Sequence, residues 1–432
     1  MTLRRLDVRG FSGGRRALAD ALPRPVDEQD RSSEAVTAII DAVRADGDAA
    51  LRRLTQEFDH VTLEGLRVPA EEVQAALGRI PPDLADALGI AHDRILAYHA
   101  HESVFDVPDF EDAGVTVRHL VRPVSRAGCY APGGRARYPS TVLMCAVPAH
   151  VAGVEDIVLC VPPGPDGRID DATLAAAAVA GIDEIYRVGG AQAIAAMAYG
   201  TESIGAVDVI VGPGNRYVAE AKRQVSGVVG VASAFAGPSE VVVIAGPNTP
   251  PDLAAIDLVV QAEHGPDGLA WLVTWSEEVA DAVTAEVDRI VEASARRADL
   301  EATLGTGGYV VVVDGPKQAC LVANIVAPEH LELLTDNAES LLPQINSAGA
   351  IFLGLNSPAS MGDYLAGPNH VLPTNRTARF ASALRVDDFR RHMHAVSITE
   401  KAIEELGPHV VTLAETEGLP AHAESVRARW QR

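Results

Sequence analysis

Residues 184–225 read EIYRVGGAQAIAAMAYGTESIGAVDVIVGPGNRYVAEAKRQV, and this stretch decides the fold. Two short apolar runs, within 184–190 and 207–215, each end in a glycine turn and are each followed by a segment with helical composition. Strands that alternate with helices are typical of a parallel sheet, because parallel neighbours need a crossover connection. The stretch therefore predicts a series of strand–helix units in an α/β fold.

The alternation extends in both directions from this stretch. Upstream lie the strand-like DIVLCVPP (156–163) and the helical TLAAAAVAG (173–181), and residues 33–100 are helical in periodicity. Downstream, a second α/β series has strand-like runs EVVVIAG (240–246), LAWLVTW (269–275), YVVVVDG (309–315) and AIFLGL (350–355), with a helix at 252–264. We expect an α/β protein with two Rossmann-like parallel-sheet domains, a helical N-terminal segment and, beyond Phe389, a small helical C-terminal tail.

Changes of texture near Pro123–Gly134 and at GPSE (237–240) suggest where the domains meet. The predicted division has an N-terminal segment (1–32), a discontinuous first α/β domain (33–129 plus 238–384), a second α/β domain (130–237) and the helical tail (385–432).

Composition limits the class of function. Hydrophobic residues make up 47% of the 432 positions, enough for two or three domains with sizeable cores. A formal net charge of −23 argues against nucleic acid or an anionic membrane as the main partner. The four cysteines form no CxxC pair, no signal peptide is visible, and the most apolar run (172–182) is too short to cross a bilayer. We expect a cytoplasmic protein.

The turns VGGAQAIAA (188–196) and VGPGNRYVAEAK (211–222) could bind a phosphate. Each places glycine and backbone N–H groups at a helix start below a sheet. Neither matches GxGxxG, because Tyr217 stands where the third glycine of the second motif would fall. By spacing alone, a dinucleotide site and a plain turn are equally open.

Three further segments offer nitrogen and oxygen donors. Gln261 and His264 are three residues apart in QAEH, so they could share a face of the last helical turn, where a metal site and a helix cap are both open. Asp363 and His370 lie in the Gly/Pro-rich MGDYLAGPNHVLPT (361–374), which we expect to be a loop after a strand.

Glu417 and His422 lie in EGLPAHAESV (417–426), and His422 is expected in the first turn of a helix that begins at Pro420. A histidine in such a tail is usually a surface residue. Taken together with the other segments, the donors include no thiolate, and they suit a divalent ion such as zinc.

The doublet Glu329-His330 in APEHLEL (327–333) is the remaining candidate. Pro followed by Glu is good first-turn composition, so Pro328 and Glu329 are expected to begin a helix. The doublet is then either a solvated helix start or an acid and a base placed side by side for chemistry.

Nine motifs, in this order, resemble the histidinol dehydrogenase family over nearly the whole chain. They are YAPGG (130–134), YPSTVLM (138–144), GGAQAIAA (189–196), GPGNRYVAEAKRQVS (212–226), AGPSE (236–240), QAEHGPD (261–267), APEHLEL (327–333), GDYLAGPNHVLPT (362–374) and EGLPAH (417–422). The resemblance implies a zinc-dependent enzyme that oxidises L-histidinol to L-histidine in two NAD-linked steps through L-histidinal, the final step of histidine biosynthesis.

The resemblance also implies site residues, carried over motif by motif. One zinc per subunit would be bound by Gln261, His264, Asp363 and His422. Substrate would be contacted by these ligands and by Ser239, His330, His370 and Glu417, while Tyr130, Gln192 and Asn215 would touch NAD. The family is a homodimer whose tail reaches the partner's active site, so Glu417 and His422 would serve the other subunit, and residues 385–432 would pack on it.

Glu329 and His330 would be the acid–base pair. A neutral imidazole with a pKa near ~6.5 suits removal of the hydroxyl proton in the first oxidation, which gives His330 that role. The second oxidation needs water added to the aldehyde, and the neighbouring carboxylate of Glu329 would deprotonate that water.

One departure and three alternatives accompany the resemblance. The family often has an acidic residue and a Pro shortly before AGPSE, where this chain reads VASAFAGPSE (231–240) with Ser233 and Phe235. The alternatives are a related zinc/NAD dehydrogenase of another small polar alcohol such as a sulfonated diol, a metal-dependent hydrolase, and a non-catalytic NAD- or metal-binding module. Glu417 favours histidinol, because its carboxylate suits an imidazole N–H and would repel a sulfonate.

Overall fold

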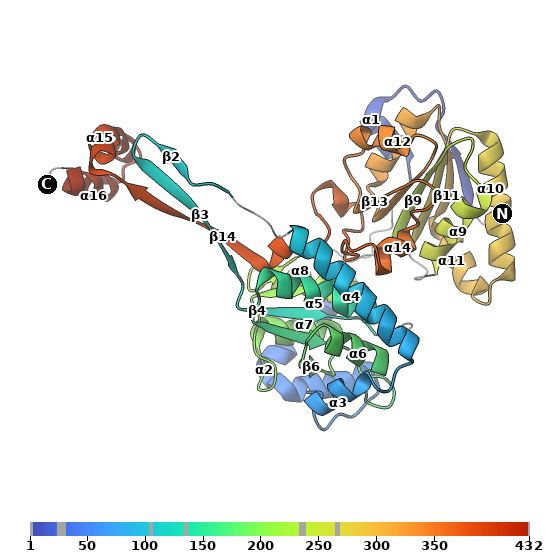
Figure 1. The fold of residues 1–432 in the computed structure, drawn as a ribbon, viewed down its shortest axis with the longest axis horizontal. Helices are drawn as coiled ribbons and strands as arrows, with labels where there is room; N and C mark the ends of the chain where they lie inside the picture. Colours follow the sequence, from blue (N-terminus) through green and yellow to red (C-terminus); the bar gives the residue numbers. More distant parts are fainter. Residues whose placement is uncertain are drawn as a thin grey trace.

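A computed structural model describes residues 3–23, 32–102, 107–133, 137–232, 239–263 and 268–430. It contains two parallel sheets, both covered by helices, and a projecting antiparallel arm (Figure 1). The predicted fold class is confirmed. Within the described ranges, no helix combines the length and the apolarity needed to span a membrane.

The six-stranded unit is built on one parallel sheet and its helices. In spatial order its strands are β1 (Arg4–Asp7), β11 (Gly308–Val312), β10 (Leu269–Thr274), β9 (Glu240–Ala245), β12 (His330–Leu334) and β13 (Ala350–Leu353). Its helices are α1 (Gly14–Ala21), α9 (Pro251–Ala262), α10 (Glu277–Ala293), α11 (Arg297–Gly307), α12 (Pro316–Val326), α13 (Ala338–Leu341) and α14 (Ala359–Tyr364), with a 3₁₀ turn η2 (Leu342–Gln344). Side chains alternate along β9, so Val241 and Val243 pack with α9 to α11, whereas Val242 and Ile244 pack with α1 and α12.

The five-stranded unit repeats this arrangement. Its strands, in spatial order, are β6 (Glu184–Tyr186), β5 (Asp156–Cys160), β4 (Arg126–Tyr130), β7 (Val209–Val211) and β8 (Gly230–Val231). Its helices are α2 (Ser33–Phe58), α3 (Ala70–Ala76), α4 (Pro82–Glu102), α5 (Pro139–Ala152), α6 (Asp171–Val179), α7 (Gly190–Tyr199) and α8 (Arg216–Val225). If strands are counted from β4 in one sheet and from β9 in the other, both have the doubly wound order 3-2-1-4-5, with β1 added to one edge.

The observed grouping of segments differs from the predicted division into domains. Helices α2 to α4 were expected to belong with residues 238–384, but Val36 and Leu51 share a core with Ile194, and Ile95 shares a core with Leu174. These helices therefore cover the five-stranded sheet. Helical periodicity shows that a segment has an apolar face, but it does not show which of two similar sheets that face will cover.

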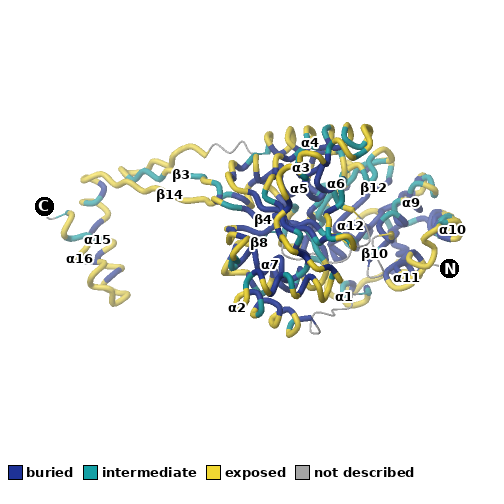
Figure 2. The backbone as a smooth tube through the Cα atoms, turned by 90° about the horizontal axis from the view of Figure 1, so that it is seen from below, coloured by how far each residue is buried: buried dark blue, intermediate teal, exposed yellow. Residues whose placement is uncertain are grey.

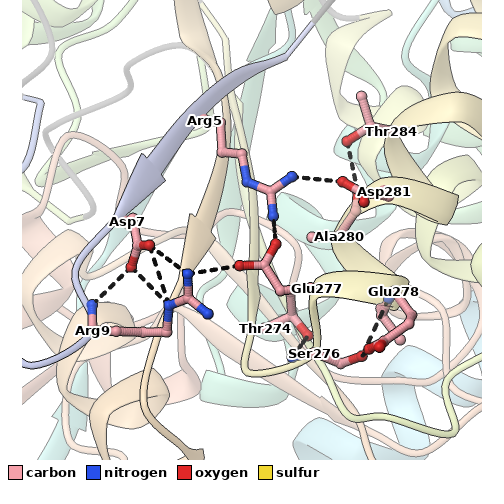
Figure 3. Close-up of polar contacts among 11 residues, drawn as sticks. Arg5, Asp7, Arg9, Thr274, Ser276, Glu277, Glu278, Ala280, Asp281 and Thr284 are labelled. Carbon is pink, nitrogen blue, oxygen red and sulfur yellow. Dashed lines mark hydrogen bonds and ion pairs between the residues drawn. The ribbon is translucent and has the colours of Figure 1, made fainter.

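The N-terminal strand β1 attaches residues of the predicted separate N-terminal segment to the six-stranded sheet (Figure 3). Arg5 forms ion pairs with Glu277 and Asp281 of α10, the second at 2.6 Å, and Arg9 lies 2.7 Å from Glu277. These side chains are 37–71% exposed, so the ion pairs contribute little. The attachment depends instead on backbone pairing with β11 and on burial of Leu3.

The arm consists of β2 (Phe110–Asp112), β3 (Val115–Pro123), β14 (Arg390–Ile398), α15 (Glu400–Thr416) and α16 (Pro420–Trp430). Strands β3 and β14 pair antiparallel, with Pro123 opposite Arg390 and Val115 opposite Ile398. The prediction of a purely helical tail is thus wrong for 390–398. Both sides of β14 are largely exposed, so its sequence has no apolar alternation that would mark a strand (Figure 2).

Candidate active site

Glu329 and His330 lie at the start of a buried strand. Helix α12 ends at Val326, Ala327 turns the chain with φ 50°, and His330 opens β12 opposite Val241 of β9 and Ala350 of β13. The prediction that Pro328 and Glu329 begin a helix is wrong. Helix α12 ends just before them, and the residues that follow form β12, which pairs with β9 and β13.

The pair is almost fully buried and held by the backbone. Glu329 is 9% exposed and His330 is 4% exposed. The N–H of Glu240 donates to Glu329 Oε2 at 3.0 Å, and the same oxygen lies 3.6 Å from His330 Nδ1. The His330 ring stacks on Phe352, with centroids 5.9 Å apart. A solvated doublet is therefore excluded.

Two of the predicted metal ligands flank the imidazole of His330. Gln261, in the last turn of α9, places Nε2 3.3 Å from His330 Nδ1, and Asp363 places Oδ1 3.2 Å from Nε2. Asp363 lies in α14, not in the loop predicted for it, because the helix Ala359–Tyr364 extends through the motif. Three segments that are distant in sequence thus meet at one ring.

Burial and crowding of carboxylates perturb the titration of this centre. Burial raises the pKa of Glu329 to about 7, against the influence of His330 and the Glu240 N–H. Burial also raises the pKa of Glu240 to about 8, and the nearby Glu329 adds to that rise. For His330, burial lowers the pKa, but Glu329 and Asp363 outweigh it and raise the pKa to about 9. The ordinary imidazole pKa expected from the sequence does not hold in this arrangement.

His370 is positioned by a defect in a helix of the other unit. Pro148 lies inside α5 and has no N–H, so the Met144 carbonyl lacks its usual donor four residues on. The buried Asn369 donates to that carbonyl at 2.6 Å. The next residue, His370, then donates through Nδ1 to the Asp363 carbonyl at 2.7 Å and faces the hydroxyl of Thr141 at 3.3 Å. This contact connects the two units at the site.

The other predicted metal and substrate residues have different outcomes. Ser239 is half-buried and directly precedes Glu240 at the start of β9. His264 lies outside the described residues, as do Ser233 and Phe235. Glu417 and His422 are exposed on the arm, away from both units, although His422 does lie in the first turn of a helix that begins at Pro420 (Figure 2).

The donor set suits zinc but is not complete within one described chain. The buried Oε1 of Gln261 has no hydrogen-bond partner within the described part of the chain, and the Asp363 carboxylate lies on the other side of the same imidazole. An unpartnered buried carboxamide oxygen beside a carboxylate fits a cation. Among the described residues, no group of three or more His, Cys, Asp or Glu side chains is arranged to hold a metal.

The predicted cofactor residues lie at the carboxyl edge of the five-stranded sheet. Tyr130 ends β4, is buried, and accepts the Gly190 N–H at 3.1 Å through its hydroxyl. Gln192 is 1% exposed, and its Oε1 has no partner among the described residues. Asn215 caps α8 by accepting the N–H groups of the second and third residues after it. Gly190 has φ 64°, and a Cβ there would lie 2.7 Å from Gln192 Oε1, so the turn requires glycine.

The predicted cofactor residues lie at the carboxyl ends of strands, whereas the Glu329–His330 centre lies at the amino ends. In doubly wound folds, ligands bind beyond the carboxyl ends of strands where the order reverses. Tyr130 at the end of β4 and the turn after β7 lie at this reversal, whereas the turn at Gly190 follows β6 at the edge of the sheet. In the six-stranded unit, the centre lies at the reversal between β9 and β12 but at their amino ends, marked by Glu240 and His330.

Sequence reasoning missed three carboxyl groups around the centre, of which two are buried and one is half-buried. Glu240 and Glu332 are 1% and 0% exposed, and half-buried Asp257 contacts Glu332. A signal was available for the first two, since each is a lone carboxylate in a strand-like apolar run, EVVVIA or HLELL. Asp257 in DLAAIDLVV carries no such signal, because a carboxylate on a helix is usually solvated.

The fold and the centre define an α/β protein of the doubly wound class, with a buried carboxyl–imidazole pair and glycine turns at two helix starts. A family model described as histidinol dehydrogenase matches residues 22–430. The histidinol dehydrogenase of Synechococcus sp. is 49% identical over 398 residues, 92% of each chain, and that of Thermosynechococcus vestitus is 48% identical over 406 residues, 94% of each.

A solved histidinol dehydrogenase structure, from Elizabethkingia anophelis, superposes with a TM-score of 0.93 at 35% identity, covering 100% of this chain and 98% of that one. The chain therefore belongs to the histidinol dehydrogenase family, a family of oxidoreductases of histidine biosynthesis.

The helix defect that positions His370 generates a stability prediction. Asn369→Ala leaves the buried Met144 carbonyl unpaired, so we expect the free energy of unfolding in urea to fall by about 1–3 kcal/mol. Pro148→Ala returns an N–H to that carbonyl. In the Asn369→Ala background it should therefore stabilise more than in the wild type. Equal effects of Pro148→Ala in both backgrounds would contradict the proposed coupling.

Proposed function

We propose that the chain catalyses the zinc-dependent, NAD-linked oxidation of L-histidinol to L-histidine through L-histidinal. The observation that carries the proposal is the buried Glu329–His330 pair with Gln261 and Asp363 on either side of the imidazole. An acid–base pair beside two oxygen donors suits an alcohol oxidation that also requires water addition. A cytoplasmic location stays a prediction from the scattered cysteines.

Metal binding would involve Gln261, Asp363 and His264 of one chain, with His422 from the arm. Zinc, when bound, would hold the amine and an imidazole nitrogen of histidinol and so fix the alcohol carbon. The chain's own residues would complete recognition. Ser239, which directly precedes Glu240, and His370, which donates to the Asp363 carbonyl, would contact the substrate, and the carboxylate of Glu417 suits the imidazole N–H of the substrate.

In the first oxidation, His330 would accept the hydroxyl proton while the carbon gives a hydride to NAD. The products are histidinal, NADH and one proton. Proton acceptance requires the neutral imidazole, and the carboxylates of Glu329 and Asp363 raise its pKa to about 9. A carboxylate engaged as a metal ligand favours the imidazolium less, because its charge is shared with the cation.

In the second oxidation, water adds to the aldehyde, and a second NAD takes the hydride from the resulting hydrate. Glu329 would deprotonate that water. Its burial raises its pKa to about 7, so the carboxylate is a stronger base than a solvated glutamate. Glu329 is directed by the Glu240 N–H, whereas His330 points toward Gln261 and Asp363, so the two groups can serve different atoms.

NAD would bind at the carboxyl edge of the five-stranded sheet, near Tyr130, Gln192 and Asn215. The glycine-dependent turn at Gly190 and the N-terminus of α8 support this placement, because the positive end of a helix attracts an anionic group such as a pyrophosphate. His370, held by α5 of the same unit, would bring the substrate within reach of the nicotinamide.

The arm would complete the site of a second subunit in a homodimer. Glu417 and His422 are exposed at its far end, and it carries exposed apolar side chains that an isolated chain leaves in water. These are Phe110, Met393, Val396, Ile398 and Leu413. A partner that covers the arm would bury them and receive both polar residues.

Loss and return of the metal test the proposal as a whole. We expect the purified protein to form NADH from L-histidinol, to lose that activity after chelation, and to regain it on addition of zinc. The sulfonated diol is the comparison substrate. NADH from that diol but not from histidinol would identify a related dehydrogenase instead, and no NADH from either would overturn the proposal.

The division of labour between the pair is tested by separate half-reactions. Glu329→Gln should spare oxidation of histidinol to the aldehyde and reduce aldehyde oxidation by about 100-fold or more, because it removes the water-activating base. His330→Ala should reduce both. Single-turnover NADH formation from each substrate measures the two steps. Equal losses in both steps for Glu329→Gln would rule out the assignment.

Exchange of the arm is tested by mixing inactive variants. His330→Ala and His422→Ala dimers, each inactive alone, should regain about a quarter of wild-type activity after subunits are exchanged at equal amounts, since half the dimers then hold one intact site. A wild-type and His330→Ala/His422→Ala mixture is the inverse control, because its mixed dimers hold no intact site. If mixed dimers of the inverse control are active and mixed dimers of the two single variants are not, the arm serves its own chain.

A further inference from the structure

Two carboxyl groups that take no part in the proposed reaction lie beneath the catalytic centre. Glu332 on β12 is fully buried, and it contacts Asp257 of α9, which is half-buried. Glu332 also accepts the N–H of Ala359, the first residue of α14, at 2.8 Å. One side chain therefore connects the strand that bears His330 to the helices that bear Gln261 and Asp363.

The spacing of these residues matches across the helix–strand contact. His330 and Glu332 are two apart in β12, about 6.6 Å along a strand, and they share one face. Asp257 and Gln261 are four apart in α9, about 6 Å along a helix, and also share a face. Helix α9 connects the parallel strands β9 and β10, so it runs in the opposite direction to both. Gln261 therefore contacts His330, and Asp257, about one turn earlier in α9, contacts Glu332.

The contact with α14 places the other flank. Asp363 lies four residues after Ala359, about one turn along the helix, so anchoring the Ala359 N–H sets the depth of Asp363 against His330. Leu331 and Leu333 point to the opposite face of the sheet, where they pack in the core with α12. Glu332 is thus a polar contact on the face of β12 that carries the chemistry.

We propose that Glu332 is a positioning residue that, with Asp257, holds α9 and α14 at the spacing that brings Gln261 and Asp363 to the two sides of His330. The part of this inference that concerns metal ligands rests on the proposed function. The part that concerns the contacts of His330 with Gln261 and Asp363 is independent of that function.

The hydrogen-bond pattern predicts which substitutions Glu332 tolerates. Burial, and then Asp257, raise the pKa of Glu332, and burial raises that of Asp257, so the contact between the two carboxyl groups favours a shared proton. Glutamine can reproduce both contacts, because its amide NH₂ donates to Asp257 and its oxygen accepts from Ala359. Leucine has a similar size and can form neither contact.

The test compares Glu332→Gln, Glu332→Leu and Asp257→Ala in the full-length protein. Zinc affinity is measured by competition with a chromophoric chelator, together with the KM for histidinol and the melting temperature. Asp48→Ala is the matched control. It removes a buried carboxylate of the five-stranded unit, which accepts from Thr201 at 2.7 Å and is remote from the centre in sequence and packing.

A second readout needs no zinc. In chelator-treated protein labelled with ¹⁵N-histidine, the ring nitrogens of His330 report its contacts with Gln261 and Asp363, and a His330→Gln spectrum identifies them. We expect Glu332→Leu and Asp257→Ala to shift these resonances and to weaken zinc binding at least about tenfold. Glu332→Gln should leave both unchanged, and Asp48→Ala should lower only the melting temperature.

The outcomes separate the inference from the proposed function. Absence of zinc binding in the wild type would overturn the proposed metal, and the His330 resonances would still decide the positioning role. Wild-type zinc affinity and unshifted resonances in Asp257→Ala would overturn the inference even if Glu332→Leu failed to fold. Zinc loss in Asp48→Ala that matches the loss in Glu332→Leu would also overturn it, since general destabilisation would then account for both.

Discussion

The pairing of β12 with β9 is the constraint on which the rest of the centre depends. It places His330 opposite Val241, brings the Glu240 N–H to the Glu329 carboxylate, and turns His330 and Glu332 toward α9. Because side chains alternate along a strand, a shift of one residue would direct both polar groups into the core around α12. The register of one strand pair therefore decides whether the chemistry is assembled.

Much of the fold could be predicted from the sequence, because fully buried parallel strands appear as short apolar runs and their crossover helices are continuous. The segment after the glycine turn at 212–215 was expected to be helical and forms α8, and the strand-like run EVVVIAG forms β9. β12 was missed because Pro328 followed by Glu329 has the composition of a first helical turn, and this signal outweighed the short polar–apolar alternation that begins at His330. Local composition could not reveal that two strands would enclose them.

The site shows the same division between local and tertiary information. The motifs flagged Gln261, Glu329, His330 and Asp363, and the structure brings these four together. Local composition could not show that Glu417 and His422 lie on an arm remote from this centre, and only the family resemblance implied it. Nor could local composition distinguish Asp257 from a solvated carboxylate, since only its contact with Glu332 gives it a role.

The proline in α5 has a consequence for how the centre is held in place. The carbonyl that Pro148 leaves without a donor lies in one unit, and Asn369, which takes it, is adjacent to a histidine of the centre in the other. The position of His370 therefore depends on a backbone carbonyl more than 200 residues away in the sequence. A change at Pro148, which touches neither substrate nor cofactor in the proposed site, would reach the centre through this one hydrogen bond.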